Sequence, residues 1–94
     1  MLFVFHYVDK PNRAELRAAN RAAHLEYADK FAERIVIGGP TLSEDGTAMT
    51  GSVIIMEFEN RAAAEAFAAD DPYVKAGLFE STVIRPFKKV RPVG

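Results

Sequence analysis

The sequence predicts an α+β fold in which one antiparallel sheet carries its helices on one face, in the order βαββαβ. Four apolar segments rich in aromatic and β-branched residues are typical of strands. Two segments between them have the spacing of apolar residues that is typical of helices. Both faces of the predicted strands are apolar, which indicates that a second copy of the chain covers the face left open by the helices.

The first strand and the first helix occupy the N-terminal third of the chain. Residues 2–8 are apolar apart from one histidine and alternate aromatic with aliphatic side chains, which predicts a strand. Residues 13–33 then follow a helical period, with Asn12 as the expected N-cap. The predicted apolar face of this helix consists of Leu16, Ala19, Ala23, Tyr27 and Phe31. Arg17 and Arg21 lie off that face.

In the middle of the chain, the sequence predicts two strands separated by a hairpin loop. Residues 35–37 read as a short buried strand that Gly38-Gly39-Pro40 brings to an end. Residues 42–50 contain Asp45-Gly46, a strong turn signal, and are predicted to form a loop. Residues 52–58 are predicted to form the third strand.

In the last third of the chain, the sequence predicts a helix, a short helical turn and a strand. Asn60 is a suitable N-cap for an alanine-rich helix at residues 61–69. Asp71-Pro72 combines an acidic cap with a proline at the first helical position, and Gly77 ends this turn. Residues 78–87 are predicted to form the fourth strand. The resulting order is that of the ferredoxin-like split βαβ arrangement.

Composition limits the classes of function. We expect one domain over residues 1–94, which is too short to bury a large core without help from a partner subunit. The absence of cysteine excludes disulfide bonds and thiolate metal sites, and agrees with the reducing cytoplasm, where we expect the protein to be located.

Neither nucleic acid nor a membrane is an expected partner. The net charge is -1, so no overall field attracts the chain to nucleic acid or to anionic lipid. Residues 1–8 are too few to span a bilayer and lack the basic leader and cleavage site of a signal peptide. The basic segment at residues 85–91 is interpreted as a solvated tail.

The apolar character of both sheet faces predicts self-association. Val53 and Ile55 point away from Ile54, Met56 and Phe58 in the third strand. The fourth strand is expected to place Phe79, Val83 and Phe87 on one face and Leu78 and Ile84 on the other. We therefore expect a homodimer, or a higher homo-oligomer, whose sheets stack about 10 Å apart. The alternative is a monomer that exposes a few aliphatic side chains.

His24 and Asp71 carry the chemistry that an acid–base enzyme needs. His24 lies at the edge of the apolar helix face, and an imidazole accepts or donates a proton near neutral pH. The alternative is a half-buried histidine bonded to a backbone carbonyl. Asp71 either caps the short helix or orients His24, which leaves the second ring nitrogen free as a base.

Other residues give weaker signals. His6 either faces a cavity between the sheet and the helices or simply packs. Gly39 and Pro40 either allow a ligand to approach the backbone closely or only end a strand. Phosphate loops, a Gly-x-Ser-x-Gly elbow and paired histidines are all absent, so neither a metal nor another cofactor is expected.

The sequence also contains a set of short motifs that resemble those of a known protein family. They are Arg21-Ala22-Ala23-His24-Leu25, Gly38-Gly39-Pro40, Thr50-Gly51-Ser52, Asp71-Pro72-Tyr73 with Ala76-Gly77-Leu78, and Pro86-Phe87-Lys88. In this order they resemble the YciI-like family over essentially the whole chain. The resemblance implies a ferredoxin-like fold that dimerises into an α/β barrel. It also implies a His–Asp site, carried over to His24 and Asp71.

The same resemblance suggests a function. One branch of the family catalyses dehydrochlorination of a chlorinated hydroxyhydroquinone, and many members have no assigned reaction. We therefore expect a cofactor-free lyase or isomerase, dehydrohalogenase-like, that acts on a small aromatic or enol-like metabolite. His24 would abstract a proton and Asp71 would stabilise the imidazolium.

Three further residues are candidates for binding the small-molecule ligand. Arg21 either attracts an anionic substrate or is solvated, while Ser52 and Tyr73 are candidates for lining the pocket. Two alternative functions stay open: a non-catalytic module that binds a small metabolite, and an oxygen-using relative such as a quinol-type monooxygenase.

Overall fold

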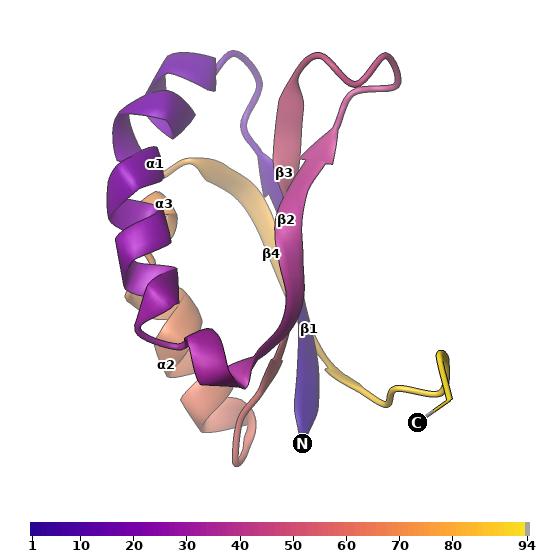
Figure 1. Cartoon of the computed structure of the whole chain (residues 1–94). Coiled ribbons are helices and arrows are strands. Elements are labelled where there is room, and N and C mark those ends of the chain that lie inside the picture. The colour runs from indigo at the N-terminus through magenta and orange to yellow at the C-terminus, as the bar shows by residue number, and fades with distance from the viewer. Residues whose placement is uncertain (94) are drawn as a thin grey trace.

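Helices lie on only one face of a four-stranded antiparallel sheet in the structure, a computed structural model that describes residues 1–93 (Figure 1). The elements are β1 Leu2–Asp9, α1 Ala14–Asp29, the 3-10 helix η1 Ala32–Arg34, β2 Ile35–Leu42, β3 Met49–Glu57, α2 Arg61–Ala69, α3 Pro72–Lys75 and β4 Phe79–Phe87. The strand order β2-β3-β1-β4 confirms the predicted ferredoxin-like α+β class. The domain predicted over residues 1–94 ends at Gly94, which lies outside the described residues, and its extent stays a prediction.

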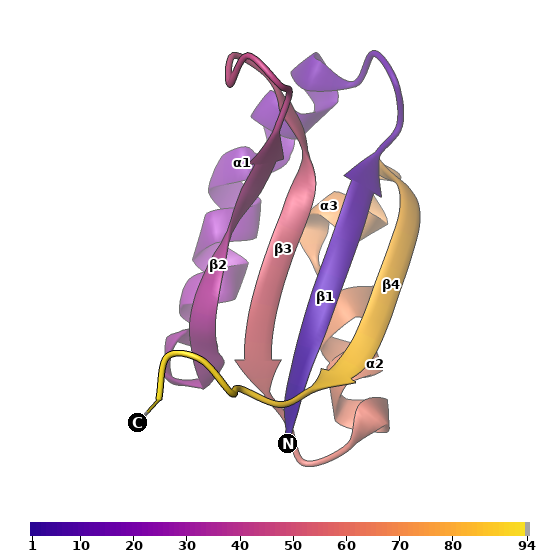
Figure 2. The same cartoon turned by 90° about the vertical axis from the view of Figure 1, so that its right-hand side faces the viewer.

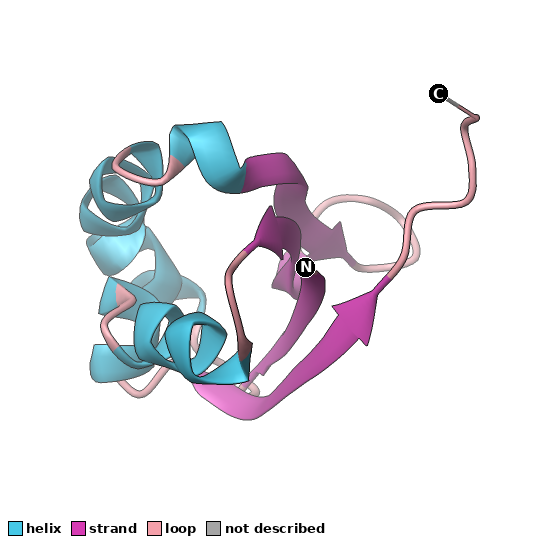
Figure 3. Ribbon diagram, turned by 90° about the horizontal axis from the view of Figure 1, so that it is seen from below, coloured by secondary structure: helices cyan, strands magenta, loops and turns pink. Residues whose placement is uncertain are grey.

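The core lies between the sheet and the helices, which form a separate layer when the molecule is viewed end-on (Figure 3). Strand β1 contributes its aromatic residues to this inner face, where Phe5 is paired with Ile54 of β3 and Ile84 of β4. The buried cluster consists of Phe3, Phe5, Tyr7, Ile54, Met56, Phe58, Ala64, Phe67 and Ala68. Because side chains alternate along a strand, this arrangement sends His6 and its aliphatic neighbours to the other face.

The other face of the sheet has no helix over it, as Figure 2 shows with the helices behind the strands. The side chains that share this open face through the strand register are Leu2, Val4, His6, Val8, Ile37, Thr41, Val53, Ile55, Glu57, Ser81, Val83, Arg85 and Phe87. Ile37 is 64% exposed and Phe87 is 40% exposed. Large apolar side chains therefore meet solvent in the single chain, as the sequence predicts.

The predicted orientation of the β4 side chains is wrong at Phe79. Val8 pairs with Ser81, whereas Asp9 pairs with Phe79, so the register shifts by one residue at this point. The shift turns Phe79 to the inner face, where its ring stacks on Tyr7 at 4.4 Å between centroids. A bulge of this kind reverses the alternation of side chains, which the sequence pattern did not reveal.

Helix α1 is shorter than the predicted 13–33 segment. It ends at Asp29, and the chain then tightens into η1 before β2 begins. The expected Asn12 cap is also wrong: Arg13 occupies the N-cap position without a side-chain cap, and Asn12 adopts a positive φ of 60° in the preceding turn. Asparagine tolerates this left-handed conformation better than most residues, which accounts for its position here.

The inward face of α1 differs from the predicted apolar stripe. Ala19 and Ala23 are exposed, whereas Arg17 is buried and the His24 side chain is only 13% exposed. The helix therefore presents polar side chains to the sheet along part of its length. Polar residues on the inner face of a helix need hydrogen-bond partners, and these define the site described below.

Strand β2 extends beyond the predicted residues 35–37. Gly38-Gly39-Pro40 does not end the strand but lies within it, and pairing with β3 continues to Leu42. Proline is tolerated here because β2 is an edge strand, so the missing N–H need not pair. The hairpin loop shortens accordingly, and β3 begins at Met49 rather than at residue 52.

The second half of the chain follows the prediction closely. Helix α2 spans the predicted residues, and the side chain of Asn60 accepts a hydrogen bond from the N–H of Ala63 at 2.9 Å. Gly77 takes a positive φ of 75° after α3. No helix within residues 1–93 is long and apolar enough to cross a membrane.

Candidate active site

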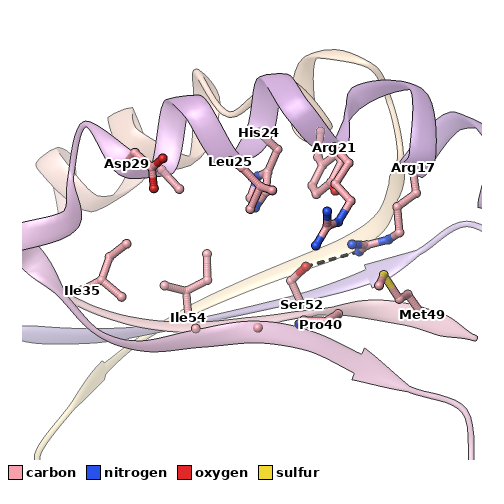
Figure 4. A pocket seen from close by; sticks show the side chains of 14 residues that line it. Arg17, Arg21, His24, Leu25, Asp29, Ile35, Pro40, Met49, Ser52 and Ile54 are labelled. Carbon is pink, nitrogen blue, oxygen red and sulfur yellow. Dashed lines mark hydrogen bonds between the residues drawn. The ribbon is translucent and has the colours of Figure 1, made fainter. Parts of the chain in front are cut away.

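A pocket of about 240 Å3 lies between α1 and the strands β2 and β3 (Figure 4). Its lining consists of Arg17, Arg21, His24, Leu25, Ala28, Asp29, Ile35, Gly38, Gly39, Pro40, Met49, Ser52, Ile54 and Tyr73. Aliphatic side chains form much of the wall, Arg17, Arg21 and Ser52 gather at one end, and Asp29 lies at the other end near Ile35 (Figure 4). Small-molecule sites commonly combine an apolar wall with a few placed polar groups in this way.

His24 faces Asp71 across the junction of α1 and α3. Its Nδ1 lies 3.1 Å from Oδ1 of Asp71, and the Asp71 side chain is 1% exposed. The two residues are 47 positions apart, so only the packing of α3 against α1 brings them together. When Nδ1 donates its hydrogen to the carboxylate, Nε2 is left as the basic nitrogen.

The local sequence places Asp71 at this junction. Asp71 is the N-cap of α3, and its Oδ1 accepts a hydrogen bond from the backbone N–H of Tyr73 at 2.8 Å. Pro72 occupies the first helical position, where its missing N–H costs nothing. The Asp71 carboxylate therefore both caps α3 and contacts His24, two roles that the sequence analysis treated as alternatives.

Tyr73 holds the imidazole ring of His24 in place. The two rings stack with centroids 4.2 Å apart and planes 14° apart. Burial raises the pKa of Tyr73, while the nearby charges of Arg17 and Arg21 act in the opposite direction. Tyr73 is therefore a neutral phenol at neutral pH, and its buried ring supports His24 at the edge of the pocket.

Arg17 is buried beneath the polar end of the pocket. Its guanidinium donates to both carboxylate oxygens of Asp9, at 2.7 and 2.9 Å, and to the backbone oxygen of Gly51 at 3.0 Å. The hydrogen bond with Asp9 is the main reason that the pKa of Arg17 is raised. The same guanidinium lies 4.8 Å from the centre of the Tyr73 ring. Arg17 thus ties α1 to β1, β3 and α3.

Arg17 also fixes the role of Ser52. One guanidinium nitrogen donates to Oγ of Ser52 at 3.2 Å (Figure 4). A hydroxyl has one hydrogen to donate, and because Oγ already accepts from Arg17, that hydrogen is available to a bound molecule. Ser52 is 5% exposed and lines the pocket, so it offers a buried hydrogen-bond donor.

Arg21 reaches into the same end of the pocket from the next turn of α1 (Figure 4). Unlike Arg17, it has no hydrogen-bond or ion-pair partner among residues 1–93. The positive charge of Arg17 is matched by Asp9, so Arg21 is the uncompensated cation of the pocket. The arrangement favours a negatively charged oxygen near Arg21 and Ser52.

The structure places most of the predicted site residues together. Arg21, His24, Gly39, Pro40, Ser52 and Tyr73 all line the pocket, and Asp71 supports His24 from behind it. His6 is the exception. It is exposed on the open face of the sheet, paired with Val53 and Val83, whereas the pocket lies on the inner face. The idea that His6 faces a cavity between the sheet and the helices is wrong, because the inward-facing residues of β1 are the aromatic ones.

Arg17 is the residue of this site that the sequence reading missed. Arg17, Arg21, His24 and Ala28 recur with the spacing of one helix face, and all four line the pocket. That spacing was a usable signal, but the apolar stripe through Ala19 and Ala23 drew attention to another face. Among residues 1–93, no group of three or more His, Cys, Asp or Glu side chains is arranged to hold a metal ion.

Comparisons with known proteins show the family of this chain. Residues 1–88 match the family model of the YCII-related domain. Protein YciI of Escherichia coli O6:H1 is 39% identical over 97 aligned residues, which cover 96% of this chain and 99% of that protein. An uncharacterised protein of Haemophilus influenzae is 38% identical with the same coverage.

Solved structures give two levels of similarity. The 5-chloro-2-hydroxyhydroquinone dehydrochlorinase of Burkholderia phenoliruptrix AC1100, in complex with 2,5-dihydroxybenzoquinone, has a TM-score of 0.88 and 40% sequence identity, with 94% of each chain covered. An antibiotic biosynthesis monooxygenase has a TM-score of 0.56 and 14% identity, with 96% of this chain and 99% of that one covered. At such low identity the second similarity shows the fold alone.

Proposed function

The chain belongs to the family of YCII-related domains, and on this basis we propose that it is a small lyase or isomerase of the dehydrohalogenase type. The observation that carries the proposal is the contact between Nδ1 of His24 and Oδ1 of Asp71 at the wall of the pocket. An imidazole held by a buried carboxylate is a general base whose free nitrogen faces the substrate.

The pocket supports a small planar substrate that carries ring oxygens. The side chains of Ile35 and Ile54 form an apolar wall on the sheet, together with Gly39 and Pro40, and Leu25 faces this wall from α1, an arrangement that suits an aromatic ring (Figure 4). Arg21 and Ser52 suit an ionised oxygen on that ring. A similar enzyme that binds 2,5-dihydroxybenzoquinone, a ring of this kind, supports the same class.

The proposed reaction removes hydrogen halide from a halogenated hydroxyhydroquinone. His24 takes the proton of one ring hydroxyl and returns a proton to the carbon that bears the halogen, which gives a non-aromatic ketone. The halide then leaves with the electrons of the carbon–halogen bond while a second hydroxyl loses its proton and the quinone forms. The substrate loses two protons, gains one and releases one halide, so the balance requires no external oxidant.

Each lining residue has a defined part in this proposal. Asp71 stabilises the imidazolium that forms on His24, and the stacked ring of Tyr73 limits its rotation. Arg21 and Ser52 stabilise the negative charge that grows on the ring oxygen as its proton leaves. Arg17 orients Ser52 and does not need to contact the substrate.

The test is turnover of 5-chloro-2-hydroxyhydroquinone under anaerobic conditions, followed by chloride release and by mass spectrometry of the product. We expect one chloride per hydroxyquinone formed, and no release from the enzyme-free control beyond the spontaneous rate. Product formation that required oxygen would contradict the proposal and favour a monooxygenase. Binding of 2,5-dihydroxybenzoquinone without any turnover of halogenated substrates would also contradict it, in favour of a binding module.

Replacing Arg21 by glutamine is expected to weaken binding of anionic 2,5-dihydroxybenzoquinone by about tenfold or more, because one charge-assisted hydrogen bond is lost. Isothermal titration calorimetry measures this difference. The control is Arg61→Gln, since Arg61 lies on α2, away from the pocket, where it pairs with Glu65. Equal affinity for the wild type and for Arg21→Gln would show that Arg21 does not bind the anion.

We also propose that a second copy of the chain covers the open face of the sheet, and that the protein acts as a homodimer in the cytoplasm. The exposed aliphatic residues on this face support the first point. The lack of cysteine supports the second, because it suits a reducing compartment.

Light scattering is expected to give twice the chain mass of 10.4 kDa for the wild type. Val53→Asp places a charge near the middle of the open face, next to His6, and is expected to give particles of the single-chain mass. Ala62→Asp adds the same charge on the exposed surface of α2 and should leave the mass unchanged. A wild-type particle of single-chain mass at working concentrations would contradict the dimer.

A further inference from the structure

Two buried polar atoms in the described part of the chain lack a hydrogen-bond partner: the hydroxyl oxygen of Tyr7 and Oδ2 of Asp71. Tyr7 is 1% exposed and Asp71 is 0% exposed. Buried polar groups are nearly always paired, so these two atoms, one of which belongs to the carboxylate that contacts the proposed base, require an explanation.

The two atoms have complementary chemistry. A phenol can donate a hydrogen bond, whereas an ionised carboxylate can only accept one. Oδ1 of Asp71 already faces the N–H of Tyr73 and Nδ1 of His24, and Oδ2 is the oxygen without a donor. No arginine or lysine donates to Asp71 among residues 1–93, so Tyr7 has no competitor for this position.

Packing brings Tyr7 and Asp71 to the same region from opposite layers. Tyr7 points inward from β1, and its ring stacks on Phe79. Phe79 in turn meets the ring of Tyr73, two residues after Asp71, edge to face at 5.9 Å. Burial is the main reason that the pKa of Tyr7 is raised, and the negative charge of Asp71 acts in the same direction.

We propose that one enclosed water bridges the two atoms, accepting a hydrogen bond from the hydroxyl of Tyr7 and donating one to Oδ2 of Asp71, and that Tyr7 in this way positions the carboxylate that faces His24. Tyr7 is then a positioning residue: it acts through Asp71 and does not contact the substrate. Its catalytic meaning rests on the proposed function, but the hydrogen-bonded link itself can be tested without any substrate.

This link between Tyr7 and Asp71 would complete a series of contacts that runs from the sheet to the pocket. Tyr7 on β1 would hold Asp71 at the start of α3, and Asp71 would hold His24 on α1. A carboxylate whose oxygens all accept hydrogen bonds is favoured in its charged form even when buried. His24 would then face a fixed anion, which is what a general base requires of its partner.

The first test observes the hydroxyl proton of Tyr7 directly by proton NMR. A hydroxyl held by an enclosed water is expected to give a resonance that exchanges slowly with bulk water and disappears in Tyr7→Phe. Asp71→Asn removes the charge and retains the helix cap, because asparagine also caps well. In that variant the Tyr7 proton is expected to move upfield and to exchange about tenfold faster or more.

Tyr27 provides the matched control. The charges of Asp70 and Asp71 also raise the pKa of Tyr27, after burial, but its hydroxyl donates to the backbone oxygen of Phe67 at 2.8 Å. The Tyr27 proton should therefore be the same in Asp71→Asn and in the wild type. A Tyr7 proton that exchanges as fast as a free phenol, or one that Asp71→Asn leaves unchanged, would overturn the inference.

Kinetics supply the second test. Tyr7→Phe is expected to lower kcat by about tenfold with little change in KM, since the substrate contacts remain. Tyr27→Phe should leave both constants unchanged. If no turnover is found in the wild type, the proposed function fails, while the NMR result still decides whether Tyr7 is linked to Asp71.

Discussion

A His24→Ala enzyme is expected to lose about 10²–10⁴-fold in kcat for dehydrohalogenation, which is the usual contribution of a general base. The loss should fall on kcat rather than on KM, because the apolar wall of the pocket and Arg21 are unchanged. Initial rates of chloride release over a range of substrate concentrations measure both constants. His24 lies at the pocket wall, so the truncated side chain leaves space at the surface of the pocket and not a void in the core.

Two controls make this result specific. Glu26→Ala changes an exposed residue on the same helix and should retain full activity. Free imidazole should restore part of the turnover of His24→Ala, since it can occupy the vacated space and act as the base. A folded His24→Ala protein with wild-type kcat would remove His24 from the mechanism.

Replacing Arg17 by methionine is expected to destabilise the protein by about 3–5 kcal/mol, the cost of leaving one member of a buried ion pair without its partner. The side chains of Arg17 and Asp9 are only 7% and 9% exposed, and their contact is bidentate. The change also deprives Gly51 and Ser52 of a donor. Thermal unfolding followed by circular dichroism should show a Tm lowered by roughly 10 °C or more.

The double variant Asp9→Leu with Arg17→Met tests the cause of that loss. It removes the unpaired carboxylate and should recover much of the stability, because apolar residues of similar size often replace a buried ion pair at little cost. Arg61→Met breaks an exposed pair with Glu65 and an exposed hydrogen bond to the backbone oxygen of Ile84, and should change stability by about 1 kcal/mol or less. If Arg17→Met were as stable as Arg61→Met, the buried pair would have no structural role.

The position of Arg17 shows what limits prediction on α1. A helical period identifies a helix but not which face turns inward when polar and small apolar residues both repeat at that spacing. Ala19 and Ala23 formed the more apolar stripe, yet they are exposed. Arg17 can be buried because Asp9, at the end of β1, pairs with its guanidinium. That partnership depends on the packing of the helix against the sheet.

Prediction from the sequence is limited in the same way at the ends of the strands. Alternation along β4 predicted that Phe79 would share a face with Val83, but the register shift opposite Asp9 turns it toward Tyr7. Glycine and proline after residue 37 predicted the end of β2, but an edge strand accommodates both. Local sequence signals do not contain the pairing register, which is set by the neighbouring strands.

The sequence by itself determined the βαββαβ order, the ferredoxin-like class, the caps at Asn60 and Asp71, and a sheet that is apolar on both faces. These features follow from side-chain periodicity and from hydrogen bonds between near neighbours, which are local properties. Only the tertiary structure decided that Asp71 meets His24, that Arg17 is buried beneath Ser52, and that His6 lies on the side away from the pocket. Such contacts join residues that are far apart in the chain, and their geometry depends on helix rotation and strand register together.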